Sequence, residues 1–167
     1  MSFMDSGKQY VTVPSFTAGG AMSFAFWVQS SASAQYARAF DFASGFLTSD
    51  NIGFQPWNTG DFYVCVLTTC THNVNILSTG LNDGVWRHFV FTIDTSGNLK
   101  VYINGAYTQT FTGCLIPSTV LRNVNEIGYD TYNAEPSFNG ALDEFYMFTT
   151  VLTAQQITNL YNQGEIS

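Results

Sequence analysis

Carboxylate groups are the first candidates for chemistry in this sequence, because two acids held on one face of a strand can hydrolyse a glycosidic bond. Asp143 and Glu144 are the one adjacent pair of acids. They fall in Ala141–Phe148, whose alternating pattern predicts a strand that points neighbouring side chains to opposite faces. His72 and His88 do not stand with a serine or cysteine in the pattern of a nucleophilic triad. The sequence therefore predicts a protein that is not an enzyme.

Two aromatic residues in polar loops are candidates for ligand contact. Trp57 follows Gln-Pro and precedes Asn-Thr-Gly, and Tyr132 lies between threonine and asparagine. A ring in such a loop either packs down or stacks on a ligand, and the apolar face of a sugar is a suitable partner. We therefore predict Trp57 and Tyr132 as ligand-binding residues. Trp27 and Trp86 fall in expected strands and are assigned to the core.

Short alternating segments separated by turn residues must position these side chains. Hairpin turns are expected at Asn104-Gly105 and at Ser96-Gly97-Asn98, and no helical pattern separates the segments. This order predicts an all-β antiparallel sandwich or jelly roll in a single domain over residues 1–167. The expected strands are Tyr10–Val13, Met22–Gln29, Arg38–Ala43, Ile52–Gln55, Phe62–Leu67, Val74–Leu77, Trp86–Ile93, Leu99–Ile103, Tyr107–Thr112, Glu126–Tyr129 and Ala141–Phe148.

One short C-terminal helix is expected near Thr153–Asn162. Thr153 and Gln156 have the spacing of a capping box, and Leu152 and Ile157 occupy the two positions of a hydrophobic staple. Gly164 supplies the expected stop.

Composition narrows the class of partner. Hydrophobic residues make up 46% of the chain and charged residues only 10%, which excludes disorder. The net charge is −7, so the basic patch that nucleic acid or an anionic membrane requires is missing. The acidic net charge is compatible with neutral glycans or cations as partners, or it serves only to keep the protein soluble. The fixed cations are Lys8, Lys100, Arg38, Arg87 and Arg122.

The three cysteines leave their pairing open. Cys65 and Cys70 have the spacing for a bridge across a short loop, and either has an alternative partner in Cys114. The start of the chain lacks the basic end and apolar run of a signal peptide, and no stretch reaches the roughly 20 apolar residues of a membrane span. We expect an extracellular or surface-associated domain, on a cell or a virion, without membrane insertion.

Several motifs in order give the chain a resemblance to a known family. It resembles the laminin G-like domains of the concanavalin A-like lectin/glucanase superfamily, whose fold is a jelly roll of two curved antiparallel sheets. The acid cluster Glu-x-Asp-x-x-Glu of that superfamily's β-glucan-cutting members is absent. The motifs are Asp5-x-Gly7-x-x-Tyr10, Phe24-x-Phe26-Trp27-Val28, Phe40–Gly45, Gly84–Asp94 with Val101–Gly105, and the closing strand and helix.

The resemblance implies a calcium site where the first strand meets the last. Asp5, the backbone at Gly7, and Asp143 occupy the matching places, and calcium requires about six to eight oxygen ligands. In the alternative interpretation, Asp5 begins a turn and Asp143 faces solvent.

A second resemblance is to pentraxins, which place calcium and ligand on an Asp-Asn pair and on acids after an Ile-Gly strand end. Asp50-Asn51 and Asp130 match, with Glu135 further on. In the alternative interpretation, these residues only form turns, which Asp and Asn often do. We predict Asp50, Asn51 and Asp130 as ligand-binding residues that orient a sugar, directly or through calcium.

Two functions follow. The preferred one is a non-catalytic, lectin-like module that binds a glycan or glycoprotein surface, with calcium as a candidate cofactor. The alternative is a structural protein–protein interaction domain of a surface or virion protein.

Overall fold

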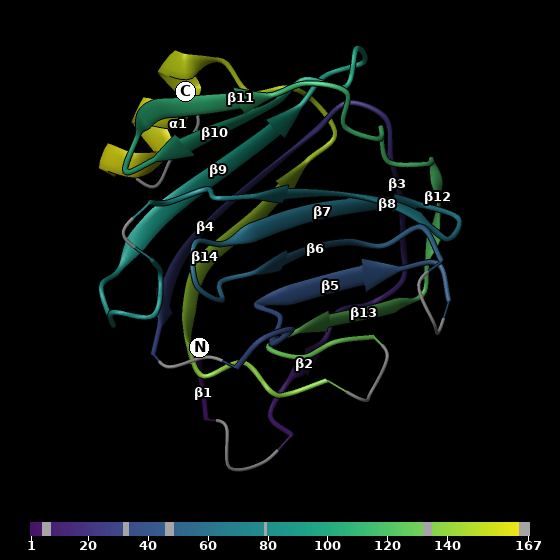
Figure 1. Ribbon diagram of the computed structural model, residues 1–167. Coiled ribbons are helices and arrows are strands. Elements are labelled where there is room, and N and C mark those ends of the chain that lie inside the picture. The colour runs from purple at the N-terminus through teal and green to yellow at the C-terminus, as the bar shows by residue number, and fades with distance from the viewer. Residues whose placement is uncertain (5–7, 32–33, 46–48, 79, 132–134, 164–167) are drawn as a thin grey trace.

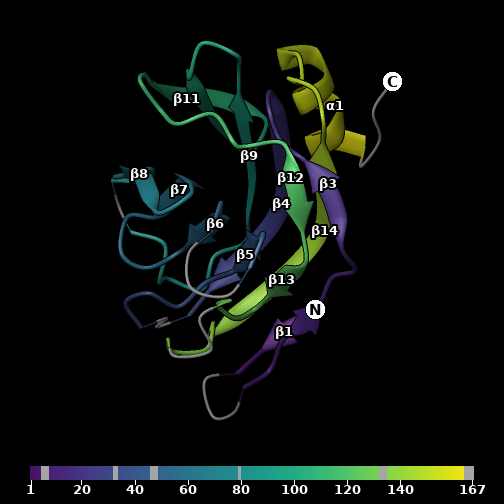
Figure 2. The same cartoon turned by 90° about the vertical axis from the view of Figure 1, so that its right-hand side faces the viewer.

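Two antiparallel sheets face each other across an apolar core. The computed structural model of the chain describes residues 1–4, 8–31, 34–45, 49–78, 80–131 and 135–163. Each sheet has six strands, and a two-stranded ribbon lies beside them (Figure 1). In Figure 2 strands β5 to β8 form one layer, and β4 and β14 lie in the other. The prediction of an all-β antiparallel sandwich with one short C-terminal helix is confirmed.

Sheet A contains the first and last strands side by side, as predicted. Ser2 lies opposite Ala141 and Phe3 lies opposite Gly140. The strands of sheet A, in spatial order, are β1 (Ser2–Phe3), β14 (Gly140–Phe148), β4 (Met22–Ser30), β9 (Arg87–Ile93), β10 (Leu99–Ile103) and β11 (Ala106–Phe111).

Sheet B forms the other layer. Its strands, in spatial order, are β2 (Val11–Thr12), β13 (Val124–Ile127), β5 (Phe40–Ala43), β6 (Ile52–Gln55), β7 (Asp61–Val66) and β8 (Thr69–Val74). The separate ribbon pairs β3 (Phe16–Ala18) with β12 (Val120–Arg122).

Phenylalanine rings from both sheets fill the space between them. Phe26 of β4 packs on Phe40 of β5 with ring centroids 5.4 Å apart, and Phe62 of β7 stacks on Phe91 of β9 at 4.5 Å. All four are fully buried, and burial of each such side chain contributes about 1.5–3 kcal/mol. Because inward residues alternate with outward ones, each sheet also has an outer face.

Helix α1 (Ala154–Gln163) covers the outer face of sheet A. The Thr153 amide donates to Gln156 Oε1 at 3.0 Å and the Gln156 amide donates to Thr153 Oγ1 at 3.3 Å, which confirms the capping box. Leu152 and Ile157 are buried in one cluster, as the staple predicts. Within the described residues no helix is long and apolar enough to cross a membrane. Gly164 lies outside the described residues.

Strand β14 contains a bulge that the alternating sequence pattern does not show. Its register on β4 shifts between Asp143 and Tyr146, and Glu144 has a φ of 47°. Leu142 and Phe145 both pack on the core although they are three residues apart, so the alternation predicted over Ala141–Phe148 is wrong at this point. The bulge also means that alternation does not separate the Asp143 and Glu144 side chains, and both residues are exposed.

Other differences from the predicted strands are local. The expected strand at Val74–Leu77 is wrong, because the chain already turns at Leu67 and β8 ends at Val74. Strands β1, β3 and β12 were not predicted, and each has at most three residues, too few to show a period. Trp86 precedes β9 and is 40% exposed, so its assignment to the core is wrong.

Candidate functional site

A pocket of about 300 Å³ lies on the outer side of sheet B, where the β6–β7 turn meets strand β8. Phe62 and Val64 of β7 point into the core, so Asp61 and Tyr63 point outward. Asp61 pairs in register with Val74 of β8, and both line the pocket. The described residues that line it are Gln35, Tyr36, Gln55, Trp57, Asn58, Thr59, Gly60, Asp61, His72, Val74 and Asn75.

Trp57 is the largest side chain of this pocket, and the loop that carries it is well defined. The Gly60 amide donates to the Trp57 carbonyl at 3.0 Å, and Gly60 has a φ of 83°. A Cβ at Gly60 would lie 2.8 Å from a methyl of Leu81, so this turn requires glycine. Trp57 is 39% exposed and Tyr36, which lines the same pocket, is 48% exposed. Both rings therefore offer apolar surface to a ligand.

Asp61 and His72 form the charged pair of the pocket. Asp61 Oδ2 and His72 Nδ1 are 2.7 Å apart. This hydrogen bond raises the pKa of His72 above its ordinary value, and burial opposes the shift only in part. The His72 ring also stacks on Tyr63, with centroids 5.6 Å apart.

The pocket therefore combines aromatic rings with hydroxyl, amide, imidazole and carboxylate groups. A sugar presents an apolar ring face and a rim of hydroxyl groups, so this combination can stack on the one and hydrogen-bond to the other. Asp61 is the one carboxylate in the lining. Hydrolysis of a glycosidic bond by a pair of acids needs a second one.

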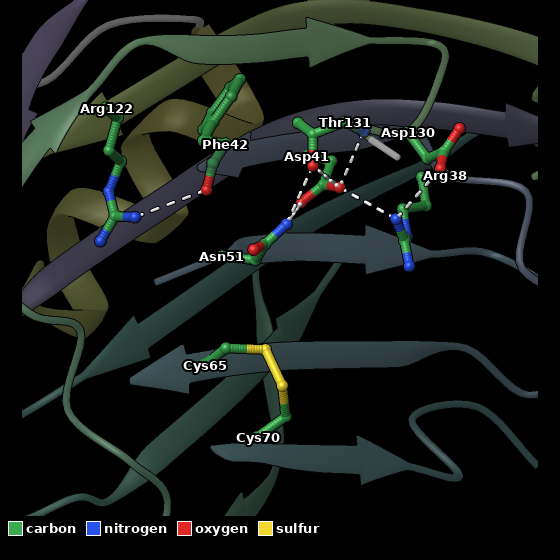
Figure 3. A network of polar contacts seen from close by, with 9 residues as sticks. All are labelled: Arg38, Asp41, Phe42, Asn51, Cys65, Cys70, Arg122, Asp130 and Thr131. Carbon is green, nitrogen blue, oxygen red and sulfur yellow. Dashed lines mark hydrogen bonds and ion pairs between the residues drawn. A yellow bond between two sulfur atoms is a disulfide. The ribbon is translucent and has the colours of Figure 1, made fainter. Parts of the chain in front are cut away.

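Asn51 and Asp130 lie in a buried polar network on sheet B and do not line this pocket. Figure 3 shows Asp41 at its centre. Asn51 Nδ2 donates to Asp41 Oδ1 at 2.9 Å, and Thr131 Oγ1 donates to Asp41 Oδ2 at 2.8 Å. Arg38 lies 3.0 Å from Asp41 and 3.7 Å from Asp130. The network connects β5 to the segment that follows β13.

Asp50 is also buried, at 5% exposure, and holds the β7–β8 turn. Its Oδ1 accepts from the Leu67 amide at 3.1 Å, and its Oδ2 accepts from Ser44 Oγ at 3.3 Å. Burial alone would raise the pKa of Asp50, but hydrogen bonds from Ser118, Leu67 and Ser44 lower it overall.

The structure thus gives Trp57 different polar neighbours from those expected. The predicted grouping of Trp57 with Asp50, Asn51 or Asp130 is not seen, because those three side chains are held in the protein interior. Their assignment as ligand-binding residues stays a prediction. Tyr132 lies outside the described residues.

The calcium ligands predicted at the chain ends are described only in part. Asp143 is exposed, and its Oδ1 accepts from the Glu144 amide at 3.0 Å within the bulge. Asp5 and Gly7 lie outside the described residues. Ser2 lies opposite Ala141 and Phe3 lies opposite Gly140. Across the described ranges no three or more His, Cys, Asp or Glu side chains cluster as metal ligands. Calcium therefore stays a prediction.

Sequence reasoning missed Asp61, His72 and Tyr36, although one signal was present. Cys65 and Cys70 form a disulfide, and they are directly opposite each other on β7 and β8 (Figure 3). This pairing fixes a register that sets Tyr63 against His72 and Asp61 against Val74. The bridge is one of the pairings that the sequence left open, and Cys114 is a free, buried thiol.

Two of the five lysine and arginine side chains are buried, so they add no exposed positive charge around the pocket. Arg38 is 8% exposed and Arg122 is fully buried. Arg122 donates to the backbone carbonyls of Phe42, Asp50 and Ser118. No lysine or arginine appears in the pocket lining.

Comparison with curated proteins shows a distant relative. A protein from Rattus norvegicus described as "Sushi, von Willebrand factor type A, EGF and pentraxin domain-containing protein 1" is 26% identical over 154 residues. The match covers 84% of this chain and 4% of that protein, so the chain spans a small fraction of the curated relatives it matches.

Solved structures share the fold at low identity. Domain 4 of AbnA, a GH43 extracellular arabinanase from Geobacillus stearothermophilus in complex with arabinotriose, has a TM-score of 0.78 and 21% identity over 96% of this chain and 75% of that one. A heptameric SAP-like pentraxin from Limulus polyphemus has a TM-score of 0.68 and 14% identity over 96% and 80%. The binding domain of Paraclostridial Mosquitocidal Protein 1 has a TM-score of 0.64 and 13% identity over 97% and 42%.

A family model provides the assignment. The laminin G model described as the concanavalin A-like lectin/glucanases superfamily matches residues 5–158, nearly the whole chain. The order of motifs, the paired sheets and the helix-covered face agree with that match. The chain belongs to the concanavalin A-like lectin/glucanases superfamily, as a laminin G-like domain.

Proposed function

We propose that this chain is a non-catalytic carbohydrate-recognition module of a surface or secreted protein, and that the Trp57 pocket is its sugar site. The observation that carries the proposal is an exposed tryptophan beside Asn58, Thr59, Asp61 and His72 in one pocket. An indole offers an apolar face and one N–H donor, and a sugar ring is flat enough to stack on that face.

The comparisons support a recognition function in general, and they do not specify the sugar or its site. One neighbour is a domain of an extracellular arabinanase in complex with arabinotriose, and others are described as binding or receptor-binding domains. Domains of this fold therefore serve recognition in other proteins. The single carboxylate of the Trp57 pocket supports a binding role in preference to hydrolysis.

A glycan microarray followed by titration calorimetry tests the proposal. We expect binding near millimolar, about 4 kcal/mol, because a shallow single pocket orders little of the sugar. Trp57→Ala should abolish binding and leave the unfolding free energy within about 0.5 kcal/mol of the wild type.

Trp86→Ala is the matched control, because Trp86 is 40% exposed and lies outside the pocket lining. Equal binding by both variants, or none by the wild type, would contradict the proposal. In the second case the interaction-domain alternative gains, and the exposed rings become candidate protein contacts.

Calcium dependence is a separate part of the proposal, and its predicted ligands are Asp143, Asp5 and the backbone at Gly7. An ion that binds only the native state raises stability by mass action, about 2.7 kcal/mol at a hundredfold excess over Kd. Calcium should therefore raise the melting temperature, chelator should lower it, and Asp143→Ala should remove the response. Superimposable melting curves in calcium and chelator would exclude a tight site.

A further inference from the structure

We infer that the Asp61–His72 pair is the element of the Trp57 pocket that determines ligand specificity, and that it selects uncharged sugars over sugars that carry a carboxylate or sulfate. This inference rests on the proposed function. It goes further, because it assigns a recognition role to two residues and a chemical class to the ligand.

The pair is held in a fixed position by its strands. Tyr63 and His72 are partners across the β7–β8 ladder, and Asp61 lies two residues before Tyr63 on the same face. The Cys65–Cys70 bridge closes the next outward-facing cross-strand pair of that hairpin. The His72 ring is therefore fixed by the Asp61 hydrogen bond at 2.7 Å and by the Tyr63 stack at 5.6 Å.

Only one nitrogen of His72 is used in this arrangement. Asp61 engages Nδ1, and Nε2 has no hydrogen-bond partner in the part of the chain that the structure describes. The side chain of His72 is 50% exposed and lines the pocket. A ligand hydroxyl can accept a hydrogen bond from Nε2 when the ring is protonated, and donate to it when the ring is neutral. The pair therefore offers a hydroxyl a pre-oriented partner at either charge.

The charge of the pair disfavours an anionic ligand when His72 is neutral. With His72 protonated, the Asp61–His72 pair is neutral, and with His72 deprotonated it carries one negative charge. Asp61 Oδ1 is buried and has no hydrogen-bond partner among the described residues, so this charge is poorly compensated.

Arg38 is the nearby cation, and its charge opposes protonation of His72 more weakly than the Asp61 hydrogen bond favours it. Arg38 packs over the Tyr63 ring at 5.2 Å, but its guanidinium faces Asp41 and Asp130, and the pocket lining holds no lysine or arginine. When His72 is neutral, an anionic sugar would therefore meet repulsion without a compensating ion pair.

The test compares neutral and anionic probes on the wild type and three variants. The neutral probes are arabinotriose, cellotriose, galactotriose and mannotriose, and the anionic probe is trigalacturonate, each titrated by calorimetry at pH 6 and pH 8. The variants are Asp61→Asn and His72→Gln. Asp83→Asn is the matched control, because it removes one carboxylate that pairs with Arg87 at 2.6 Å, outside the pocket lining.

We expect the wild type to bind a neutral trisaccharide at least tenfold more tightly than trigalacturonate at pH 8, with a smaller ratio at pH 6. His72→Gln should weaken neutral binding about tenfold, an expected loss for one hydrogen bond to a charged group. Asp61→Asn should reduce the neutral-to-anionic ratio at least tenfold. Asp83→Asn should leave both unchanged.

The outcomes separate this inference from the proposed function. If Trp57→Ala abolishes binding but Asp61→Asn and His72→Gln keep wild-type affinity and selectivity, the sugar site stands and the inference fails. If the wild type binds no glycan, both fail. Should either variant unfold, NMR of the wild type decides: a neutral trisaccharide at saturation should shift the Nε2 resonance of His72, and an unchanged resonance overturns the inference.

Discussion

The outer faces of the two sheets carry the same kinds of residue in opposite surroundings. On sheet A, Trp27 packs on His88 at 5.3 Å and on Tyr161 of helix α1 at 5.6 Å. On sheet B, Trp57 and His72 line an open pocket. The comparison indicates that the helix determines which face of this sandwich is available to a ligand.

The two histidines differ in pKa because one is buried and the other is exposed beside a carboxylate. Burial lowers the pKa of His88 to about 4. The Asp61 hydrogen bond raises the pKa of His72. His88 is therefore a neutral packing residue at physiological pH, and His72 is a titratable group exposed to solvent. Histidine therefore packs beneath the helix on sheet A, whereas on sheet B it is available to contact a ligand.

Truncating a side chain that is buried between helix α1 and sheet A should have the largest effect on stability. This change tests directly whether the helix covers that face. Ile157 is fully buried between α1 and sheet A, so Ile157→Ala should lower the unfolding free energy by about 2–5 kcal/mol. Val74→Ala is the counterpart on sheet B, where Val74 is 48% exposed, and should cost less than about 0.5 kcal/mol. Urea unfolding measures both. Similar losses would show that the two faces are not differently covered.

Acid should destabilise the protein through His88. Its folded pKa of about 4 lies below the unfolded value of about 6.5, so the unfolded state binds more protons between these values. Stability is complete above pH 6.5 and decreases as the pH falls toward 4, by up to about 3 kcal/mol. The difference in unfolding free energy between wild type and His88→Gln should shrink over this window. A pH-independent difference would contradict the assignment.

Features with a local signal were predictable from the sequence. The capping box at Thr153 and Gln156 and the staple at Leu152 and Ile157 depend on neighbours three to five residues apart, and both form as expected. Trp57 is exposed in the expected loop.

Features that depend on distant contacts were not predictable. Asp41 and Thr131 are 90 positions apart, and nothing local in either segment indicates that they hydrogen-bond. Asn51 has the same pattern as an exposed turn residue, but the network around Asp41 buries it. Trp86 has the same parity as Val90, which packs in the cluster under helix α1, but Trp86 precedes β9 and is 40% exposed.

Removing the disulfide should affect the open face and leave the covered one intact. The Cys65–Cys70 bridge closes a loop with a sequence separation of 5, and loop-closure entropy gives such a bridge about 2 kcal/mol. The double variant C65S/C70S should lose about that much on urea unfolding. It should also bind sugar more weakly, because the bridge lies next to the Tyr63–His72 pair. An NMR titration of His88 serves as the control and should not change.

The smallest effect, and the most direct test of the comparison, is the titration of His72. NMR should find its pKa above the ordinary value of about 6.5, and Asp61→Asn should lower it, because the hydrogen bond with Asp61 is what raises it against burial and Arg38. Because the folded pKa is raised, the contribution to stability is complete below the unfolded pKa and is lost as the pH rises through the folded one. Half of the His72 side chain is exposed, so solvent screening limits this contribution to less than about 1 kcal/mol. As the pH rises, the contribution of His88 to the unfolding free energy should therefore increase and that of His72 should decrease. The contribution of His88 should be the larger of the two. If both histidines titrate below the ordinary value, the pocket is as desolvated as the helix interface, and sheet B does not offer the open face that the proposed sugar site requires.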